Sequence, residues 1–465
     1  MVSSLGTVFA DCADFYTREI CAGGWTLSFC FFTGMTDRAL LGDLVLRPLL
    51  GEMRAGVFAG DLSAVLRAAV VRDAENEQTA ADALLRGEVL LCVRKTTASG
   101  GEKTRTVLVN LQTGLSRDVS EPNSDVTIRG PRVGFVEDIE KNVTLLRQSL
   151  RTPDLKFLSL EVGKISHTRV MLCYLDSRAD KALVSELSAK ICRCDAEALA
   201  DSGNLEMLIL GKRSPLFPVF GSTEKADKAA SKLLAGRVGI LVDGSPFVLT
   251  APYVFAESIQ SAEDYLHTPY YATAIRLVRF LSVFLSLFLP ALLVCCGKIP
   301  EQALPEGLRK QLLNVQSDLP TSLFLECLTS LLVFELVREV GVRMPRTVGD
   351  AVGIVASIIL GDAAVEAGLA SPIVILVTAL SAVCAFIVPA YMYATVLLRA
   401  VFLFAAELFG FAGVFLGLAV LLTVTSRLES FGTPYLSPLS PWKAKGLEDF
   451  LLAIPKKTVG RKEEL

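Results

Sequence analysis

The sequence predicts a two-part fold, in which an α/β N-terminal region of two subdomains is followed by an α-helical, multi-pass membrane domain. The chain of 465 residues is 52% apolar and only 20% charged. Its charges are unevenly spread, because only 19 of the 95 charged residues fall in Ala274–Ser426. Strand-like and helix-like apolar patterns alternate before residue 265, whereas long charge-free stretches follow residue 273. We therefore expect a soluble part joined to a membrane part.

The first 152 residues are predicted to form the first α/β subdomain. Asp37–Leu50 has helical apolar spacing, and Pro48 is expected to end that helix. Glu88–Val93 and Thr104–Leu111 are rich in β-forming residues, and the glycine-containing segment between them predicts a hairpin. In Val136–Arg151 apolar residues recur on one helical face, which predicts an amphipathic helix.

Residues 153–265 are predicted to form the second α/β subdomain, with a boundary near residue 152. An Asp-Gly pair between two apolar runs is a strong short-range signal for a hairpin, and Asp243-Gly244 is such a pair. The expected elements are a strand pair, an amphipathic helix and this hairpin, namely Leu155–Val162 with Thr168–Leu175, Lys181–Ile191, and Arg237–Val242 with Phe247–Thr250.

Residues 266–426 are predicted to form the transmembrane helical domain. Phe280–Cys296, Ala367–Leu398 and Leu408–Ser426 carry no charge over 17, 32 and 19 residues. About 20 apolar residues are needed to cross the hydrocarbon core of a bilayer. Gly349–Gly368 and Thr321–Val340 are weaker candidates because they contain acidic residues. The sequence thus predicts four to five spans.

The charges that flank these segments leave the number of spans open. Lysines and arginines in the tail, residues 427–465, favour a cytoplasmic C-terminus and therefore an even number of spans. In that arrangement Thr321–Val340 is re-entrant or amphipathic. If the segment crosses instead, Arg343, Arg346 and Arg399 fall on the cytoplasmic side and the tail lies outside.

The composition also indicates which class of partner is not expected and in which compartment the N-terminal region lies. A net charge of −3 and a pI of about 5.7 argue against a nucleic-acid-binding protein. The 11 cysteines have irregular spacing and form no CxxC pair, which favours reduced thiols and a cytoplasmic N-terminal region. Val2–Ala10 lacks the basic region of a signal peptide, so none is expected.

The inventory of catalytic side chains is poor. The chain has two histidines, His167 and His267, and each is interpreted as a surface or interfacial residue. The sequence contains no HExxH, GxSxG, Walker phosphate loop or GxGxxG motif. We therefore predict that the protein is not an enzyme, with no catalytic, metal-binding or cofactor-binding residues and no cofactor.

Acidic residues within apolar segments are the candidates for an ion path. Ionisable groups are costly at the centre of a bilayer, so they usually face a bundle interior or a water path. Asp362 and Glu366 are four residues apart and share a helical face. In an oligomer such carboxylates could form a ring that passes cations. The alternative is an interfacial or paired role; the five candidates are Asp362, Glu366, Glu407, Glu335 and Glu326.

Two groups of residues are candidates for coupling or interface contacts. The first group immediately precedes the predicted helix at 136–151. Either its backbone amides and Arg132 bind an anion at the start of that helix, or the group is a sharp turn that only positions the helix. The second is an arginine-rich group around a proline. Their members are Arg129, Gly130, Pro131, Arg132, Gly134 and Phe135, and Arg338, Arg343, Pro345 and Arg346. Arg276 and Arg279, at the head of the first span, are expected to reach the lipid headgroups.

Several ordered phrases along the chain point to one family. They are Glu121-Pro122, Ile128–Phe135, Gly236–Phe247, Ser261–Tyr265, Arg276–Phe280, Leu289–Ala291, Phe334–Arg346, Gly361–Gly368, Phe386–Pro389 and Ser430–Leu436. Together they resemble the A subunit of the GerA-type nutrient receptors of bacterial endospores. The resemblance covers nearly the whole chain and is weakest in the first 80 residues.

The resemblance implies a multi-pass protein of the spore inner membrane that works with B and C subunits to convert nutrient sensing into germination. It also implies self-association into a homo-oligomer that builds an ion-conducting path among the membrane lipids. Three departures from the family pattern, at Asp125, Val133 and Thr223–Asp227, are compatible with either a divergent lineage or a paralogue, such as one of the SpoVAF type. A transporter-like protein and a membrane-anchored enzyme are the other classes considered, and we find no internal repeat that would favour the former.

Overall fold

The computed structural model describes residues 1–68, 70–96, 102–112, 131–211, 215–265, 267–299, 322–344, 361–442 and 449–450. The chain divides into two units. One comprises Met1–Ser214 with Phe220–Pro252, and the other Pro215–Val219 with Tyr253–Pro455. We call them the α/β unit and the helical unit.

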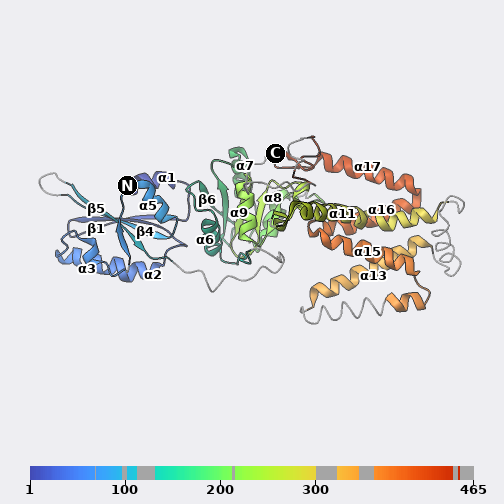
Figure 1. The fold of residues 1–465 in the computed structure, drawn as a ribbon, viewed down its shortest axis with the longest axis horizontal. Helices are drawn as coiled ribbons and strands as arrows, with labels where there is room; N and C mark the ends of the chain where they lie inside the picture. Colours follow the sequence, from blue (N-terminus) through green and yellow to red (C-terminus); the bar gives the residue numbers. More distant parts are fainter. Residues whose placement is uncertain are drawn as a thin grey trace. The chain divides into compact units, whose positions relative to one another are not determined.

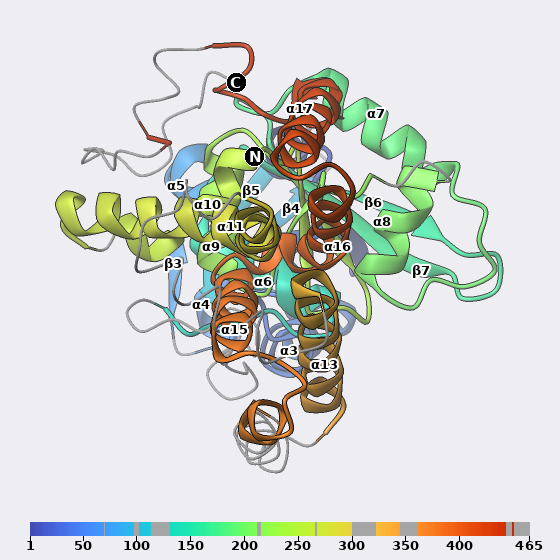
Figure 2. The same cartoon turned by 90° about the vertical axis from the view of Figure 1, so that its right-hand side faces the viewer.

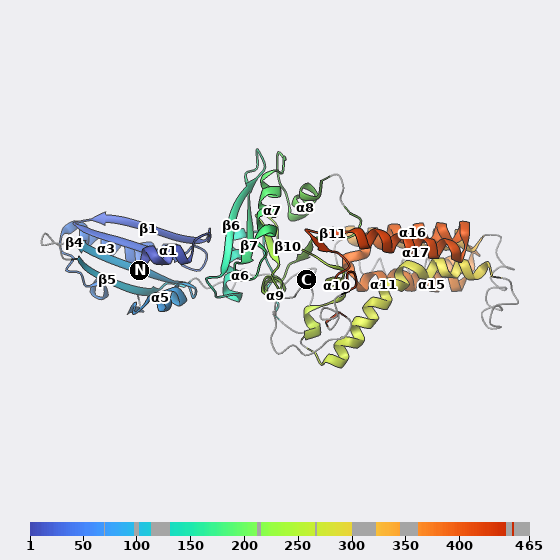
Figure 3. The ribbon, with the colours of Figure 1, turned by 90° about the horizontal axis from the view of Figure 1, so that it is seen from above.

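The α/β unit contains two five-stranded antiparallel sheets (Figures 1 and 3). The first has the order β1-β2-β4-β5-β3, and its strands are β1 (Phe15–Ala22), β2 (Trp25–Phe32), β3 (Val71–Asp73), β4 (Glu88–Thr96) and β5 (Glu102–Asn110). The predicted hairpin is confirmed as β4 and β5, whose register pairs Leu90 with Leu108.

Helices cover both faces of the first sheet. On one face Leu5 and Leu84, from α1 (Val2–Val8) and α5 (Glu77–Leu84), join a core with sheet residues such as Leu90. On the other, the core contains Val45, Leu49 and Met53 from the helical stretch after Asp37. The elements of this stretch are α2 (Arg38–Leu40), a π-helical turn (Leu41–Leu46), α3 (Arg47–Ala55) and, further on, α4 (Leu62–Val65).

The prediction that Pro48 ends this helix is wrong. Pro48 lies in the first turn of α3, where its lack of an N–H group is tolerated. The helix continues to Ala55 and ends at Gly56, whose left-handed backbone (φ 71°) caps it.

The second sheet has the order β6-β7-β9-β10-β8 and confirms the predicted strand pair and hairpin. Its strands are β6 (Leu155–Val162), β7 (Thr168–Leu175), β8 (Gly221–Thr223), β9 (Val238–Val242) and β10 (Val248–Ala251). Its helices are α6 (Ile139–Ser149), α7 (Lys181–Cys192), α8 (Ser202–Leu210) and α9 (Ala226–Leu234), of which α7 confirms the predicted amphipathic helix.

Helix α6 forms as predicted but belongs with the second sheet. Its residues Ile139, Val143 and Leu146 share one hydrophobic core with Phe157 of β6 and Leu233 of α9. The hydrophobic cores therefore divide before α6, on the N-terminal side of the boundary predicted near residue 152.

In its described residues the helical unit contains five long helices, α11 (Pro269–Gly297), α13 (Leu323–Arg343), α15 (Pro372–Ile387), α16 (Met392–Phe409) and α17 (Phe411–Arg427). α11 packs against α15 and α16, α16 against α17, and α13 against α15 (Figures 1 and 2). Shorter elements are α10 (Phe255–Ile259), the 3₁₀ turns Ala262–Tyr265 and Pro389–Tyr391, and the hairpin strands β11 (Glu429–Ser430) and β12 (Thr433–Pro434).

Pro290 interrupts the hydrogen bonding of α11 without ending the helix. A proline has no N–H group, so the carbonyl four residues earlier, that of Ser286, loses its helical donor. Ser381 of α15 donates its hydroxyl hydrogen to that carbonyl at 2.9 Å. A neighbouring helix thus satisfies the freed acceptor, as is common inside membrane bundles.

The predicted spans that fall on described residues coincide with helices, with different boundaries. Among the described residues two helices are long and apolar enough to cross a membrane, Pro269–Gly297 and Pro389–Phe409. Pro372–Ile387 and Phe411–Arg427 are apolar but shorter. The charge-free stretch Ala367–Leu398 is therefore divided between α15 and α16, whereas most of Gly349–Gly368 lies outside the described residues.

Candidate functional site

The start of α11 carries a buried ionic cluster. Arg276 is completely buried, and its Nε donates to Asp264 Oδ2 at 2.9 Å. Another nitrogen of Arg276 donates to Asp449 Oδ1 at 3.0 Å and to the Asp449 carbonyl at 2.7 Å. Arg279 donates to Asp264 at 2.8 Å and to the carbonyl of Ile259 at 2.9 Å. We call these residues the α11 cluster.

The α11 cluster corrects the expectation that Arg276 and Arg279 reach the lipid headgroups. Both guanidinium groups point into protein and are neutralised by carboxylates there. Tyr265 joins the cluster, because its hydroxyl donates to Asp449 Oδ2 at 2.9 Å and its ring lies 5.4 Å from the Arg276 guanidinium carbon. Burial, followed by the charge of Asp449, raises the pKa of Tyr265. The cluster thus ties the segment before α11 to the C-terminal tail.

A second polar group joins three distant segments of the helical unit. Tyr391, just before α16, accepts hydrogen bonds from the hydroxyl groups of Ser258 at 2.7 Å and Tyr435 at 2.9 Å. The amide of Tyr253 donates to Ser430 Oγ at 2.9 Å. These contacts fix the β11–β12 hairpin against the segment that precedes α11.

Three of the five candidate carboxylates are already engaged. Glu326 is 2% exposed, and its Oε2 accepts from the amide of Ser371 at 3.0 Å, which caps the N-terminus of α15. Glu335 pairs with Arg338 on its own helix at 2.6 Å. Glu407, near the end of α16, pairs with Lys298 just after α11 at 3.0 Å.

Asp362 and Glu366 differ from these three. Both are exposed on the helical segment 361–366, four residues apart. Within the described part of the chain, neither carboxylate forms a hydrogen bond or an ion pair. They are therefore the candidate carboxylates that remain free to meet water or a cation.

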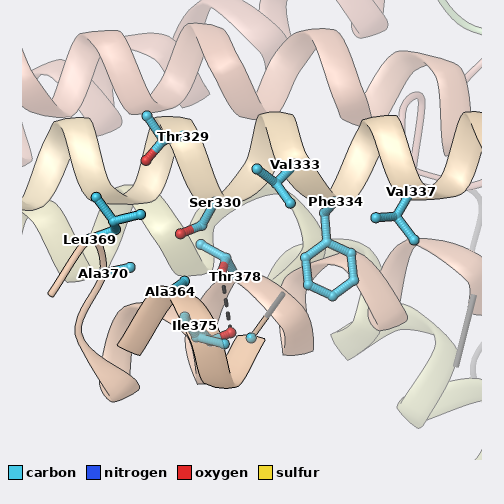
Figure 4. Close-up of a pocket in the computed structure, with 11 residues that line it drawn as sticks. Thr329, Ser330, Val333, Phe334, Val337, Ala364, Leu369, Ala370, Ile375 and Thr378 are labelled. Atoms are coloured by element: carbon cyan, nitrogen blue, oxygen red, sulfur yellow. Dashed lines mark hydrogen bonds between the residues drawn. The ribbon is translucent and has the colours of Figure 1, made fainter. Parts of the chain in front are cut away.

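The cavity between α13 and α15 has a volume of about 180 Å³ (Figure 4). Figure 4 shows Thr329, Ser330 and Phe334 of α13 on one side and Ile375 and Thr378 of α15 on the other. The Thr378 hydroxyl donates to carbonyls of its own helix, at 2.7 Å and 3.2 Å. Its described lining holds no ionisable side chain, so this cavity is an apolar packing space.

The first coupling candidate lies against the segment that departs from the family pattern. Gly134 forms an antiparallel bridge with Lys225, and the amide of Phe135 donates to the Glu224 carbonyl at 2.7 Å. Phe135 is buried in the core of the second sheet, whereas Pro131 and Arg132 are exposed. Arg129 and Gly130 lie outside the described residues.

The two described members of the second coupling candidate each form an ion pair within their own helix. Arg338 pairs with Glu335, and Arg343 pairs with Glu339 at 2.7 Å, each within α13. Pro345 and Arg346 lie outside the described residues. In the part of the chain that is described, no three His, Cys, Asp or Glu side chains gather as a metal site would require.

The sequence did not predict that Asp264 and Asp449 are the partners of Arg276 and Arg279. Asp264 lies in a phrase that carries the family resemblance, so it was visible, whereas nothing in the tail distinguishes Asp449. The sequence indicates no role for Arg399 beyond its effect on the topology, yet its side chain is 3% exposed in the middle of α16. Its signal was a lone arginine within a long charge-free run.

Comparison with known proteins places the chain in a family. The family described as "Bacillus/Clostridium GerA spore germination protein" matches residues 3–465. The chain belongs to the GerA family. It is 32% identical over 451 residues to spore germination protein KA of Bacillus subtilis (strain 168), covering 95% of this chain and 82% of that protein.

Other GerA relatives include a sporulation protein. Stage V sporulation protein AF of Bacillus subtilis (strain 168) is 32% identical over 354 residues, covering 75% of this chain and 71% of that protein. The crystal structure of the N-terminal domain of the A subunit of the Bacillus megaterium spore germinant receptor GerK3 aligns with a TM-score of 0.40 and 24% identity. It covers 55% of this chain and 94% of that one. The family match and the similarity to protein KA and to stage V sporulation protein AF indicate a role in spore germination.

Proposed function

We propose that this GerA protein is the A-type subunit of a nutrient germinant receptor and converts nutrient sensing by its partners into germination. The observation that carries the proposal is the family match from residue 3 to residue 465. In this proposal the protein crosses the spore inner membrane several times, its α/β unit is cytoplasmic, and B- and C-type subunits are its partners. In this proposal the protein binds its partner subunits, conducts ions and catalyses no reaction.

We further propose that copies of the chain assemble into a homo-oligomer around a cation path. Asp362 and Glu366 support this, because both are exposed and unpaired among the described residues. Repeated around a symmetry axis, such carboxylates would form the charged rings that select cations in many channels. Glu326, Glu335 and Glu407 fit this role less well, since each already holds a partner.

The α11 cluster supports a route by which the nutrient signal reaches α11 from the segment that precedes it. It joins the segment that enters the first long helix to residue 449 of the tail through two arginines and two aspartates. A displacement of the entering segment would therefore act on α11 through charged hydrogen bonds rather than through a flexible linker.

The test is cation flux in liposomes that contain the full-length chain with its B- and C-type partners. We expect flux with the wild-type protein and a loss of at least tenfold with the double variant Asp362→Asn/Glu366→Gln. The matched control is Glu339→Gln, which removes an exposed carboxylate of α13. Absence of flux in the complete wild-type complex, or unchanged flux in the double variant, contradicts the cation path. Flux that depends on a co-transported substrate would favour a transporter.

An accessory channel protein of the stage V sporulation type is the second candidate. The equal identity of 32% to protein KA and to stage V sporulation protein AF favours neither over the other. Co-purification separates them, because a receptor subunit is expected to retain B- and C-type subunits through solubilisation, whereas an accessory protein is not.

A further inference from the structure

Among the described residues, Arg399 is a buried cation with no counter-charge in contact. It is 3% exposed, and among the described residues it forms neither a hydrogen bond nor an ion pair. Its Nε atom is buried without an acceptor. An arginine keeps its charge in proteins. Burial of an unpaired charge is strongly unfavourable, so an anion or a polar group is expected to compensate it.

The space beside Arg399 is a cavity of about 160 Å³ between α13 and α16. Arg399 and Glu335 provide its charged lining, and the rest is apolar: Leu328, Leu331, Leu332, Val396 and Ala400. A water molecule occupies about 30 Å³ in the liquid, so the cavity has room for a small ion with a few waters.

Among the described residues, the charges around the cavity leave one positive charge in excess. Glu335 forms an ion pair with Arg338 at 2.6 Å, which balances these two charges, although its Oε2 atom is buried without a hydrogen bond. Arg399 interacts electrostatically with each of them, favourably with Glu335 and unfavourably with Arg338. One monovalent anion would balance this group of charges, whereas a cation would add to the excess.

The position of Arg399 along its helix argues against a lipid phosphate as that anion. Arg399 lies ten residues from each end of the apolar helix Pro389–Phe409. At 1.5 Å per residue this is about 15 Å from either end, about half the thickness of the hydrocarbon core. A headgroup phosphate at the membrane surface is therefore too far away.

We propose that the cavity between α13 and α16 is a binding site for one small inorganic monovalent anion, such as chloride, held by Arg399. The site does not depend on the proposed cation path. A bound anion would join α13 to α16 through Arg399 and weaken the repulsion between Arg399 and Arg338, and would thereby stabilise the packing of the two helices.

The test measures binding of radiolabelled chloride and thermal unfolding of the full-length protein in detergent, with chloride replaced by gluconate at constant ionic strength. We expect about one chloride per chain and a saturating rise in melting temperature of about 2–4 °C. Arg399→Gln is expected to abolish both effects, whereas Arg399→Lys retains the charge and should keep weakened binding. Arg427→Gln, at an exposed arginine that ends α17, is the matched control and should bind as the wild type.

Glu335→Gln distinguishes a binding site from a purely structural arginine. Removing this negative charge adds to the positive excess, so we expect chloride affinity to rise about fivefold to tenfold. If Glu335 is instead the true partner of Arg399, the variant loses stability and gains no chloride affinity, which overturns the proposal. Chloride dependence that is absent from the wild type, or equal in wild type and Arg399→Gln, also overturns it.

Discussion

Arg147 in the α/β unit and Arg399 in the helical unit are both buried arginines, but their surroundings are opposite. Arg147 is fully buried and donates to both carboxylate oxygens of Asp14, at 2.8 Å and 3.1 Å. It also donates to the Leu155 carbonyl at 3.0 Å, and its guanidinium carbon lies 4.6 Å from the Phe32 ring centre. Arg399 has no such contacts among the described residues.

This difference separates a structural charge from a candidate functional one. The Asp14–Arg147 pair joins segments 133 residues apart, next to the backbone bridge between Cys12, which precedes β1, and Phe157 of β6. Every charge there has a partner, so the pair can fix one geometry. An unpaired buried charge stores unfavourable energy that a ligand or a movement can release. We therefore expect the change in the free energy of unfolding, when a charged residue is replaced, to depend on how deeply its ion pair is buried.

The largest expected effect is that of Asp14→Ala. It leaves Arg147 buried without its carboxylate, and breaking such a pair costs about 3–5 kcal/mol. Unfolding of the full-length chain by denaturant can be followed through Trp25, which is 6% exposed in the core of the first sheet. Asp61→Ala, which removes an exposed partner of Arg105, is the control and should cost at most about 1 kcal/mol. A similar cost for both variants would show that burial of the pair is unimportant.

Asp264→Ala should have the second largest effect. It removes the acceptor shared by Arg276 and Arg279, and hydrogen bonds to charged groups contribute about 1.5–3 kcal/mol. We expect a lower melting temperature and faster proteolysis of the tail, because Asp449 then holds Arg276 alone. The control is Glu429→Ala at an exposed position, and a tail cleaved equally fast in both variants would argue against the α11 cluster as a tether.

The pair of Lys298 and Glu407 should have a smaller effect. Both side chains are more than one third exposed, at 39% and 36%, and ion pairs of this kind contribute about 0.2–1 kcal/mol. A double-mutant cycle with Lys298→Gln and Glu407→Gln measures their coupling by thermal unfolding. A coupling above about 2 kcal/mol would instead place this end of α16 in a medium of low polarity.

The smallest effect is expected for Glu206→Gln in α8. Burial raises the pKa of Glu206. A carboxyl with a raised pKa in the folded state favours folding most when it is protonated, below its unfolded pKa, and this benefit is lost as the pH rises through the folded pKa. At pH 7 the variant should therefore be more stable than the wild type, by up to about 0.5 kcal/mol, and the difference should vanish near pH 4. Equal stability at pH 7 would show that burial of this charge carries no cost.

Local patterns predicted several elements of the chain correctly. The hairpins β4–β5 and β9–β10, the strand pair β6–β7 and the helix α7 follow from apolar alternation, helical spacing and an Asp-Gly turn. These signals lie within about ten residues of the element, so the sequence carries them directly. The prediction that Pro48 ends a helix is wrong because proline is compatible both with the end of a helix and with its first turn.

Sequence alone determined the division into an α/β part and an apolar helical part, the family, and the short set of charges in the apolar part. Only the tertiary structure decided what each charge meets. Glu326 caps α15, Glu407 meets Lys298, Arg276 meets Asp449, and Arg399 faces a cavity. The physical reason is that a charge's energy depends on groups within a few ångströms, which here come from residues 45 to 173 positions away.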